Sequence, residues 1–218
     1  MLAMYAVFFL WKFLGLDPYL AMIIVVPGAY VFGYGLQRGI IGKASHGRDE
    51  IILLVTLGVS IVIENAALFF FSASERSVLV PYDLDGIDLG VTYAVYPELI
   101  ALGGSLLITF ALWLFMSLTD TGKAIRAVAK ERQGARLVGI NVDHIFAVTF
   151  GIGPACVAAA ASLLVPTYAV HPQIGYLFVL IAFTVVVLGG MGSFIGALVG
   201  GFLIGVTEQL GRLYLGES

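Results

Sequence analysis

The side chains that could carry enzymatic chemistry are few, and their spacing matches no catalytic pattern. Both Gly-Lys-Ala tripeptides, at 42–44 and 122–124, lack the upstream glycine and the following Ser or Thr of a phosphate-binding loop. The histidines are far apart in the chain and belong to no HExxH or Cys/His motif: His46, His144 and His171. We therefore expect no catalytic residues, no metal site and no cofactor bound by this chain.

Acidic and amide side chains inside apolar sequence are a second class of candidate. Glu64 and Asn65 interrupt one apolar stretch, and Glu208 lies near the end of another. A charged group within a bilayer costs roughly 2.5–3.5 kcal/mol. Such residues therefore either line a polar pathway, form hydrogen bonds between helices, or reach the membrane interface. The sequence leaves these interpretations open.

Glycines spaced four residues apart mark a third kind of site. They form two series within one apolar stretch: Gly192, Gly196 and Gly200, and then Gly201 and Gly205. Small residues at this spacing allow neighbouring membrane helices to approach closely. We interpret both series as helix-packing faces, with a moving interface as the alternative.

The most distinctive segment is basic and lies between two apolar stretches. Residues 119–141 hold five of the eleven Lys and Arg residues: Lys123, Arg126, Lys130, Arg132 and Arg136. Four residues nearby approximate an apolar stripe of helical period: Ile125, Val128, Ala129 and Ala135. Arg132 interrupts this stripe, but the pattern still predicts one amphipathic helix.

The ends of this amphipathic helix are indicated by capping residues. Asp120 or Thr121 could cap its start, and Gly139 could end it. Asn141 or Asp143 could then cap the next helix. Such a helix either rests on anionic lipid or presents its basic face to a soluble partner. The pattern alone does not decide between the two.

The composition indicates which kind of protein positions these residues. Of the 218 residues 60% are hydrophobic and 11% are charged, and the mean hydropathy is +1.03; soluble proteins have about 25% charged residues. We therefore predict an all-α, polytopic transmembrane bundle that forms one domain over residues 1–218. Cys156 lies in an apolar run, where a buried filler is expected. The net charge of −3 and the lack of a basic tail do not indicate nucleic-acid binding.

About seven membrane segments are expected, because each crossing needs about 20 apolar residues. The predicted segments are 2–10, which is partial, and 19–36, 51–71, 99–118, 145–170, 176–188 and 194–210. The last two come from one apolar stretch, 174–207, which is too long for a single span. Three glycines within 188–193 are expected to divide it.

The distribution of charge predicts which loops lie inside the cell. Loops 37–50 and 119–143 together carry eight of the eleven basic residues, so both are expected to be cytoplasmic. Loop 72–98 has Arg76 as its one basic residue and is otherwise acidic. We expect this loop to be extracytoplasmic.

Two stretches of the sequence resemble a known family. "GKAIRAVAKERQGARLVGINVDHIFAVTFGIG" (122–153) is similar to the cytoplasmic loop and following helix of branched-chain amino-acid ABC transporter permeases. "AFTVVVLGGMGSFIGALVGGFLIGVTE" (182–208) resembles a second hallmark of that family. The Glu64-Asn65 pair stands where the family tends to have Gln-Asn, which is a weaker likeness.

This resemblance implies a permease subunit of an ATP-driven importer of the bacterial inner membrane. Its implied partners are two cytoplasmic P-loop ATPase subunits, a second homologous permease and an extracytoplasmic substrate-binding protein. ATP would be bound by the partner subunits. The basic segment would be the coupling segment that contacts the ATPase, through Lys123, Arg126 and Lys130. The family's alanine-and-glycine pattern within that segment maps onto Ala127, Ala135 and Gly139.

The resemblance also leaves differences and alternatives. The family has about two further N-terminal segments and one further C-terminal span, so we expect this chain to be a truncated product. Its implied substrates are leucine, isoleucine and valine, with urea or short amides as other possibilities. The alternative functions are an ion-coupled secondary transporter that uses Glu64 and Glu208, and a membrane subunit that only scaffolds its partners.

Overall fold

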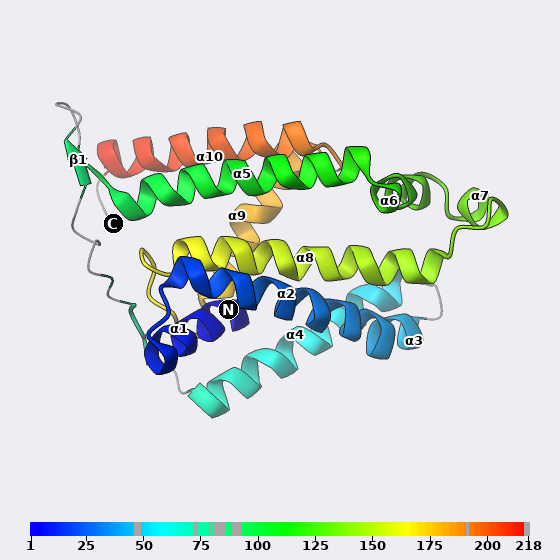
Figure 1. The fold of residues 1–218 in the computed structure, drawn as a ribbon, viewed down its shortest axis with the longest axis horizontal. Coiled ribbons are helices and arrows are strands. Elements are labelled where there is room, and N and C mark those ends of the chain that lie inside the picture. Colours follow the sequence, from blue (N-terminus) through cyan, green and yellow to red (C-terminus); the bar gives the residue numbers. More distant parts are fainter. Residues whose placement is uncertain are drawn as a thin grey trace. The chain divides into compact units, whose positions relative to one another are not determined.

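The computed structural model describes residues 1–45, 49–71, 74–78, 80, 86–88, 93–190 and 192–215. The chain is built almost entirely of helices (Figure 1). It divides into two compact units, Met1–Pro172 and Gln173–Ser218, and each is described by itself below. His46 lies outside the described residues, as do 46–48 of the predicted loop 37–50 and 72–73, 79, 81–85 and 89–92 of the predicted loop 72–98.

The helices of the first unit follow the predicted apolar segments closely. They are α1 (Leu2–Leu14), α2 (Pro18–Leu36), the π-helical turn η1 (Gln37–Ile41), α3 (Gly42–Ser45), α4 (Asp49–Phe71), α5 (Tyr96–Leu118), α6 (Asp120–Lys130), α7 (Arg132–Leu137) and α8 (Val142–Leu164). Two three-residue strands, β1 (Gly86–Asp88) and β2 (Tyr93–Val95), pair antiparallel before α5. The sequence analysis did not anticipate this small hairpin.

The predicted all-α membrane bundle is confirmed. Among the described residues, five helices are long and apolar enough to cross a membrane: Pro18–Ala44, Ile51–Phe71, Tyr96–Leu118, Val142–Leu164 and Phe194–Gly211. Two further apolar helices, α1 and α9 (Ile174–Gly189), are shorter. Each of the seven expected segments therefore contains a helix, and five of these helices reach the length of a full span. The segment expected to run from 145 to 170 is shorter than predicted, because α8 ends at Leu164.

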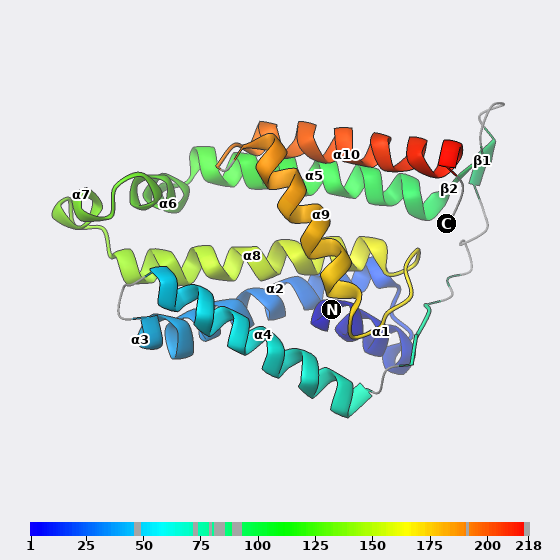
Figure 2. The ribbon, with the colours of Figure 1, turned by 180° about the vertical axis from the view of Figure 1, so that it is seen from behind.

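Helices α2 and α8 form the closest pair in the first unit (Figures 1 and 2). A Cβ added to Gly33 would lie 2.9 Å from both the Phe150 carbonyl oxygen and Pro154 Cγ. From the other side, a Cβ on Gly151 would lie 3.0 Å from Tyr30. Both glycines are buried. The two backbones therefore touch, and this crossing requires glycine on each helix.

Arg76 contacts three parts of the first unit. Its guanidinium carbon lies 5.5–6.0 Å from the ring centroids of four aromatic residues: Tyr5, Phe8, Phe9 and Phe71. The same side chain donates a hydrogen bond of 2.8 Å to the Phe71 carbonyl. Its backbone pairs with Val170 through bonds of 3.0 and 2.7 Å. The one basic residue of loop 72–98 thus joins α1, the end of α4 and the segment after α8 through cation–π and backbone contacts.

The second unit is a pair of helices, α9 and α10 (Phe194–Leu215), joined by a tight turn. The predicted break at 188–193 is confirmed, since α9 ends at Gly189 and α10 begins at Phe194. Gly190 and Gly192 have φ of +84° and +90°, which only glycine adopts easily. Met191 lies outside the described residues.

The glycines of the second unit differ in what surrounds them. A Cβ on Gly196 would collide with the Gly189 carbonyl, and a Cβ on Gly200 would lie 3.0 Å from the Val185 carbonyl. A Cβ on Gly201 would lie 3.8 Å from the Val185 side chain, which is an ordinary contact. A Cβ on Gly205 would have no atom within 4 Å. Close approach of α9 and α10 therefore depends on Gly196 and Gly200.

Candidate functional site

The basic segment begins at a sharp corner between α5 and α6. Thr119 is the capping residue, because its hydroxyl accepts a hydrogen bond of 3.0 Å from the Gly122 amide. The same hydroxyl donates a bond of 2.7 Å to the Phe115 carbonyl in the last turn of α5. The expected cap at Asp120 or Thr121 is therefore wrong by one or two residues. Asp120 instead lies in the first turn, where its carboxylate is 3.0 Å from Lys123 Nζ.

Gly122 lets α6 turn back against the end of α5. A Cβ at this position would lie 2.5 Å from the Met116 carbonyl oxygen and 2.7 Å from that of Phe115. Both obstacles are backbone atoms, which cannot rotate away. The corner therefore requires glycine at position 122 as well as the Thr119 cap. Both residues lie within the corner itself, so the local sequence determines the angle between α5 and α6.

The predicted single amphipathic helix is wrong, because the segment forms two helices. Glu131 leaves helical geometry with φ of −153° and ψ of +105°, which ends α6 and caps α7. Its carboxylate accepts a hydrogen bond of 3.2 Å from the Gln133 amide. The interruption of the apolar stripe at Arg132 marks this break, since the change of direction brings Ala135 onto the buried side.

The end of the segment matches the sequence prediction. Gly139 has φ of +82° and follows α7 at the point where the chain reverses. Asn141 caps α8, since its side-chain oxygen accepts a hydrogen bond of 3.1 Å from the His144 amide. The structure therefore selects Asn141 over Asp143 as the cap.

One face of α6 and α7 is buried against the start of α8. The cluster consists of Ile125, Val128, Ala135, Val142, Ile145 and Val148. Ala129 is exposed and does not belong to it, so the predicted stripe was wrong at that position. This apolar contact fixes α6 and α7 to α8, because moving them away would return its side chains to water.

The opposite side of α6 is exposed and basic. It carries Lys123, Arg126, Ala127 and Lys130, all exposed, and we call these four residues the basic face. Gly139 is also exposed, whereas Ala135 is buried in the cluster. Six residues of the basic segment were expected to take part in coupling to an ATPase. Five of them are accessible, and the sixth, Ala135, is buried against α8.

We expect loss of the Thr119 hydroxyl to loosen the corner between α5 and α6. Thr119→Val removes the cap and the bond to Phe115, and should cost about 1 kcal/mol locally. Amide hydrogen exchange at Gly122 should then be about fivefold faster than in the unchanged chain. Thr119→Ser keeps the hydroxyl and should exchange as the unchanged chain does. Equal exchange rates in the Val and Ser variants would contradict this role of the cap.

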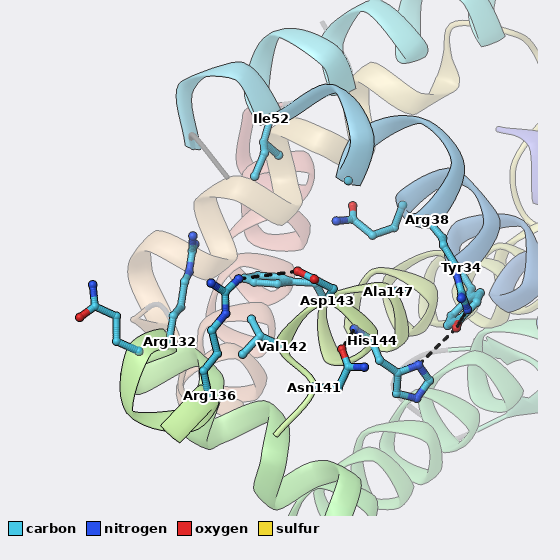
Figure 3. A pocket seen from close by; sticks show the side chains of 14 residues that line it. Tyr34, Arg38, Ile52, Arg132, Arg136, Asn141, Val142, Asp143, His144 and Ala147 are labelled. Atoms are coloured by element: carbon cyan, nitrogen blue, oxygen red, sulfur yellow. Dashed lines mark hydrogen bonds and ion pairs between the residues drawn. The ribbon is translucent and has the colours of Figure 1, made fainter. Parts of the chain in front are cut away.

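An open pocket of about 850 Å³ lies between α7, the start of α8 and the end of α2 (Figure 3). Arg132 lies over the Phe146 ring at 4.9 Å, and Arg136 is 3.8 Å from Asp143. On the other wall the Tyr34 hydroxyl accepts a 3.0 Å bond from Arg38. It also lies 3.2 Å from His144 Nδ1. The sequence analysis did not find this pocket.

The acidic and amide candidates within apolar helices lie on two different helices, α4 and α10. Glu64 is partly buried on α4, while the neighbouring Asn65 is exposed and donates a 2.8 Å bond to the Ile61 carbonyl of its own helix. Glu208 is exposed on α10. Within the described parts of the chain, no three His, Cys, Asp or Glu residues are grouped so as to hold a metal ion.

Comparison with known proteins gives the class of this chain. The family "Branched-chain amino acid transport system / permease component" matches residues 1–218. The high-affinity branched-chain amino acid transport system permease protein BraD of Pseudomonas aeruginosa is 34% identical over 215 residues, which are 94% of this chain and 70% of BraD. No solved structure matches the chain significantly.

Two other relatives show how far the similarity extends. The permease protein LivH of Escherichia coli K12 is 34% identical over 201 residues, which are 88% of this chain and 63% of LivH. The fructose import permease protein FrcC of Rhizobium meliloti is 29% identical over 119 residues, 51% of this chain and 33% of FrcC. The chain thus spans about two thirds of the length of BraD and LivH.

The fold and these matches define a multi-pass membrane permease. The chain belongs to the branched-chain amino acid transport system permease family, and the resemblance found in the sequence is confirmed. The matched family is one of transport permease components.

Proposed function

We propose that this chain is the permease subunit of an ATP-driven importer in the inner membrane, with branched-chain amino acids as its substrates. The observation that carries the proposal is the basic face of α6, which is exposed while its other side is fixed to α5 and α8. An exposed cationic surface whose other side is packed against two helices is suited to bind a soluble partner and to transmit its motion to those helices. ATP would be bound and hydrolysed by two partner subunits.

The contacts of α6 with its neighbours suggest how such a push would be transmitted. Force on the basic face would reach α5 through the Thr119 and Gly122 corner, and α8 through the apolar cluster. From α8 it would pass to α2 through the crossing at Gly33 and Gly151. Because these contacts are backbone to backbone or buried, the helices would tilt as units. Tilting of this kind opens a pathway to one side of the membrane at a time.

The loops on either side of the membrane would contact different partners. The segment 119–143 and loop 37–50 would face the cytoplasm, and loop 72–98 would face an extracytoplasmic substrate-binding protein. Residues 1–218 would act as one transmembrane domain and form half of the translocation pathway. A second homologous permease would form the other half. The substrate class is supported by the names of BraD and LivH. FrcC, a fructose permease, resembles only about half of the chain.

The experiment that tests this function is uptake in proteoliposomes. The chain is co-expressed with the second permease, the ATPase subunits and the binding protein of its own locus, and uptake of labelled leucine is measured. We expect uptake only with ATP on the ATPase side, and no loss when ionophores collapse the ion gradients. ATPase subunits lacking their phosphate-loop lysine provide the negative control.

The same assay separates the alternative functions. An ion-coupled transporter would continue without ATP, would stop with ionophores, and would be inactivated by Glu64→Gln. A scaffold would move none of leucine, isoleucine, valine, urea or short amides in the complete assembly. Either result would refute the ATP-driven importer.

A further inference from the structure

The end of α7 carries two adjacent aliphatic side chains that are largely exposed. Leu137 is 88% exposed and Val138 is 76% exposed, and we call this pair the apolar tip. The other large, exposed Leu, Ile and Val side chains that the structure describes lie in the span-length helices or in the two shorter apolar helices, α1 and α9. Lipid can cover those side chains, but the apolar tip belongs to none of these helices.

The apolar tip lies outside the membrane spans. One span ends at Leu118 and the next begins at Val142, and the basic segment joins them. Helix α7 extends beyond the end of α8 that starts at Val142, as both views of the fold show (Figures 1 and 2). Its sequence, RQGARL, contains no apolar run that could enter a bilayer. The two side chains are therefore held in water, where adjacent exposed apolar groups indicate a protein-binding surface.

The turn after α7 fixes the direction of the apolar tip. The Gly139 amide donates a hydrogen bond of 3.1 Å to the Arg136 carbonyl, and the Ile140 amide donates one of 3.0 Å to the Ala135 carbonyl. With φ of +82° at Gly139, these two bonds form a Schellman motif. Ala135 is buried in the apolar cluster and Ile140 packs against it. The inner side of the turn is thus anchored, and the two side chains between Arg136 and Gly139 are held outward.

The chemistry of the segment defines the partner that fits it. Aliphatic side chains on a fixed turn lose little conformational freedom on binding, so they are suited to an apolar groove. The basic face of α6 is exposed on the same segment. A matching partner therefore has a groove that is apolar where it receives the tip and acidic where it meets the basic face.

We propose that Leu137 and Val138 insert into an apolar groove of the cytoplasmic ATPase subunit and supply most of its binding energy. The basic face steers the ATPase and sets its orientation, as charged groups at an interface do. Gly139 acts through the turn that holds the tip and not by contact with the ATPase. This inference rests on the proposed function, since it names the side chains that hold the proposed partner.

The test measures binding of the ATPase subunits by biolayer interferometry. The full chain is reconstituted in nanodiscs with the second permease of its own locus. In Leu137→Ala/Val138→Ala we expect binding to be about 30-fold weaker, which is the loss typical of truncating the centre of an interface. Leu137→Met/Val138→Ile keeps the apolar volume and should bind within about twofold of the unchanged chain. Loss of binding in this conservative variant equal to that in the alanine variant would overturn the tip as an apolar contact.

A matched pair on a membrane helix is the control. Leu57→Ala/Val62→Ala removes the same two types of side chain from α4, where they are 62% and 68% exposed, and should bind the ATPase as the unchanged chain does. Full binding in Leu137→Ala/Val138→Ala would overturn the tip and leave the ATP-driven importer standing. Absence of ATPase binding by the unchanged chain would overturn both.

Salt separates the tip from the basic face. Raising the salt concentration from about 0.1 M to about 1 M shortens the range of electrostatic interactions from about 10 Å to about 3 Å. The loss of binding in Lys123→Gln/Arg126→Gln should therefore shrink at high salt, because the unchanged chain then gains little from these charges. The loss in Leu137→Ala/Val138→Ala should be the same at both concentrations. A loss in the alanine variant that disappears at high salt would overturn the tip.

A fluorescent label distinguishes the ATPase groove from the bilayer. Cys156 is the one cysteine of the chain, so Leu137→Cys/Cys156→Ala can be labelled with bimane at position 137 alone. The label should report water before the ATPase subunits are added and an apolar environment afterwards. An apolar environment before their addition would overturn the proposal, because the tip would then contact lipid or another part of the permease.

Discussion

Reversing the charge of the basic face is expected to abolish ATPase capture and reduce leucine uptake to background. The triple variant Lys123→Glu/Arg126→Glu/Lys130→Glu replaces three exposed cations by anions at the proposed ATPase contact. Placing like charges against a complementary surface costs several kcal/mol, which is more than a tenfold loss of binding. Co-purification with the ATPase subunits in mild detergent and uptake in proteoliposomes measure the two effects.

The triple variant should remain folded, because the substituted side chains are exposed and outside the apolar cluster. The ion pair between Lys123 and Asp120 is on the surface and contributes little to stability. Lys12→Glu, an exposed charge reversal on α1, is the control and should leave capture unchanged. If the triple variant still captured the ATPase subunits and transported leucine, the ATPase would contact another surface.

The membrane helices could be predicted from the sequence because run length is a local property. An apolar stretch either reaches the thickness of a bilayer or does not, and three glycines within 188–193 indicate a turn without knowledge of any partner. The sequence also limited the cap of α8 to Asn141 or Asp143, because a capping side chain bonds an amide only two or three residues away. The cap of α6 is just as local, but it lies at Thr119, one residue before the two candidates.

The break in the basic segment was visible in the sequence but was not interpreted as one. Arg132 stood in the apolar stripe as an exception to a single helix. In the structure α6 ends at Lys130, Glu131 leaves helical geometry, and a second helix starts at Arg132, which places Ala135 in the cluster with Ile125 and Val128. A single change of helical phase can thus mark a helix end, even without glycine or proline.

The pocket and the α2–α8 crossing could not be predicted from the sequence, since both depend on contacts between distant residues. Tyr34 and His144 are 110 positions apart, and the one hint was that loops 37–50 and 119–143 were expected on the same side. Gly33 and Gly151 belong to different helices and not to the four-residue series that led to Gly196. At the crossing of α2 and α8, close packing leaves no repeat in the sequence of either helix.

Replacing Gly33 by leucine is expected to prevent correct folding of the first unit. The new Cβ would lie 2.9 Å from the Phe150 carbonyl oxygen and from Pro154, both held within α8. Even Gly33→Ala should cost about 1–3 kcal/mol, because the contact is already full, which lowers the melting temperature by several degrees for a chain of this size. Leucine adds three further carbons at the same place and should leave little monodisperse protein on size-exclusion chromatography.

Matched positions on each helix provide the controls. Gly28 lies on α2 and Gly153 on α8, and a Cβ on either would have no atom within 4 Å. Leucine at these positions changes hydropathy and helix propensity in the same way, so both variants should purify as the unchanged chain does. Gly151→Leu should fail as Gly33→Leu does. If Gly33→Leu and Gly28→Leu behaved alike, α2 and α8 would not be held backbone to backbone, and motion entering at α6 would lack its route from α8 to α2.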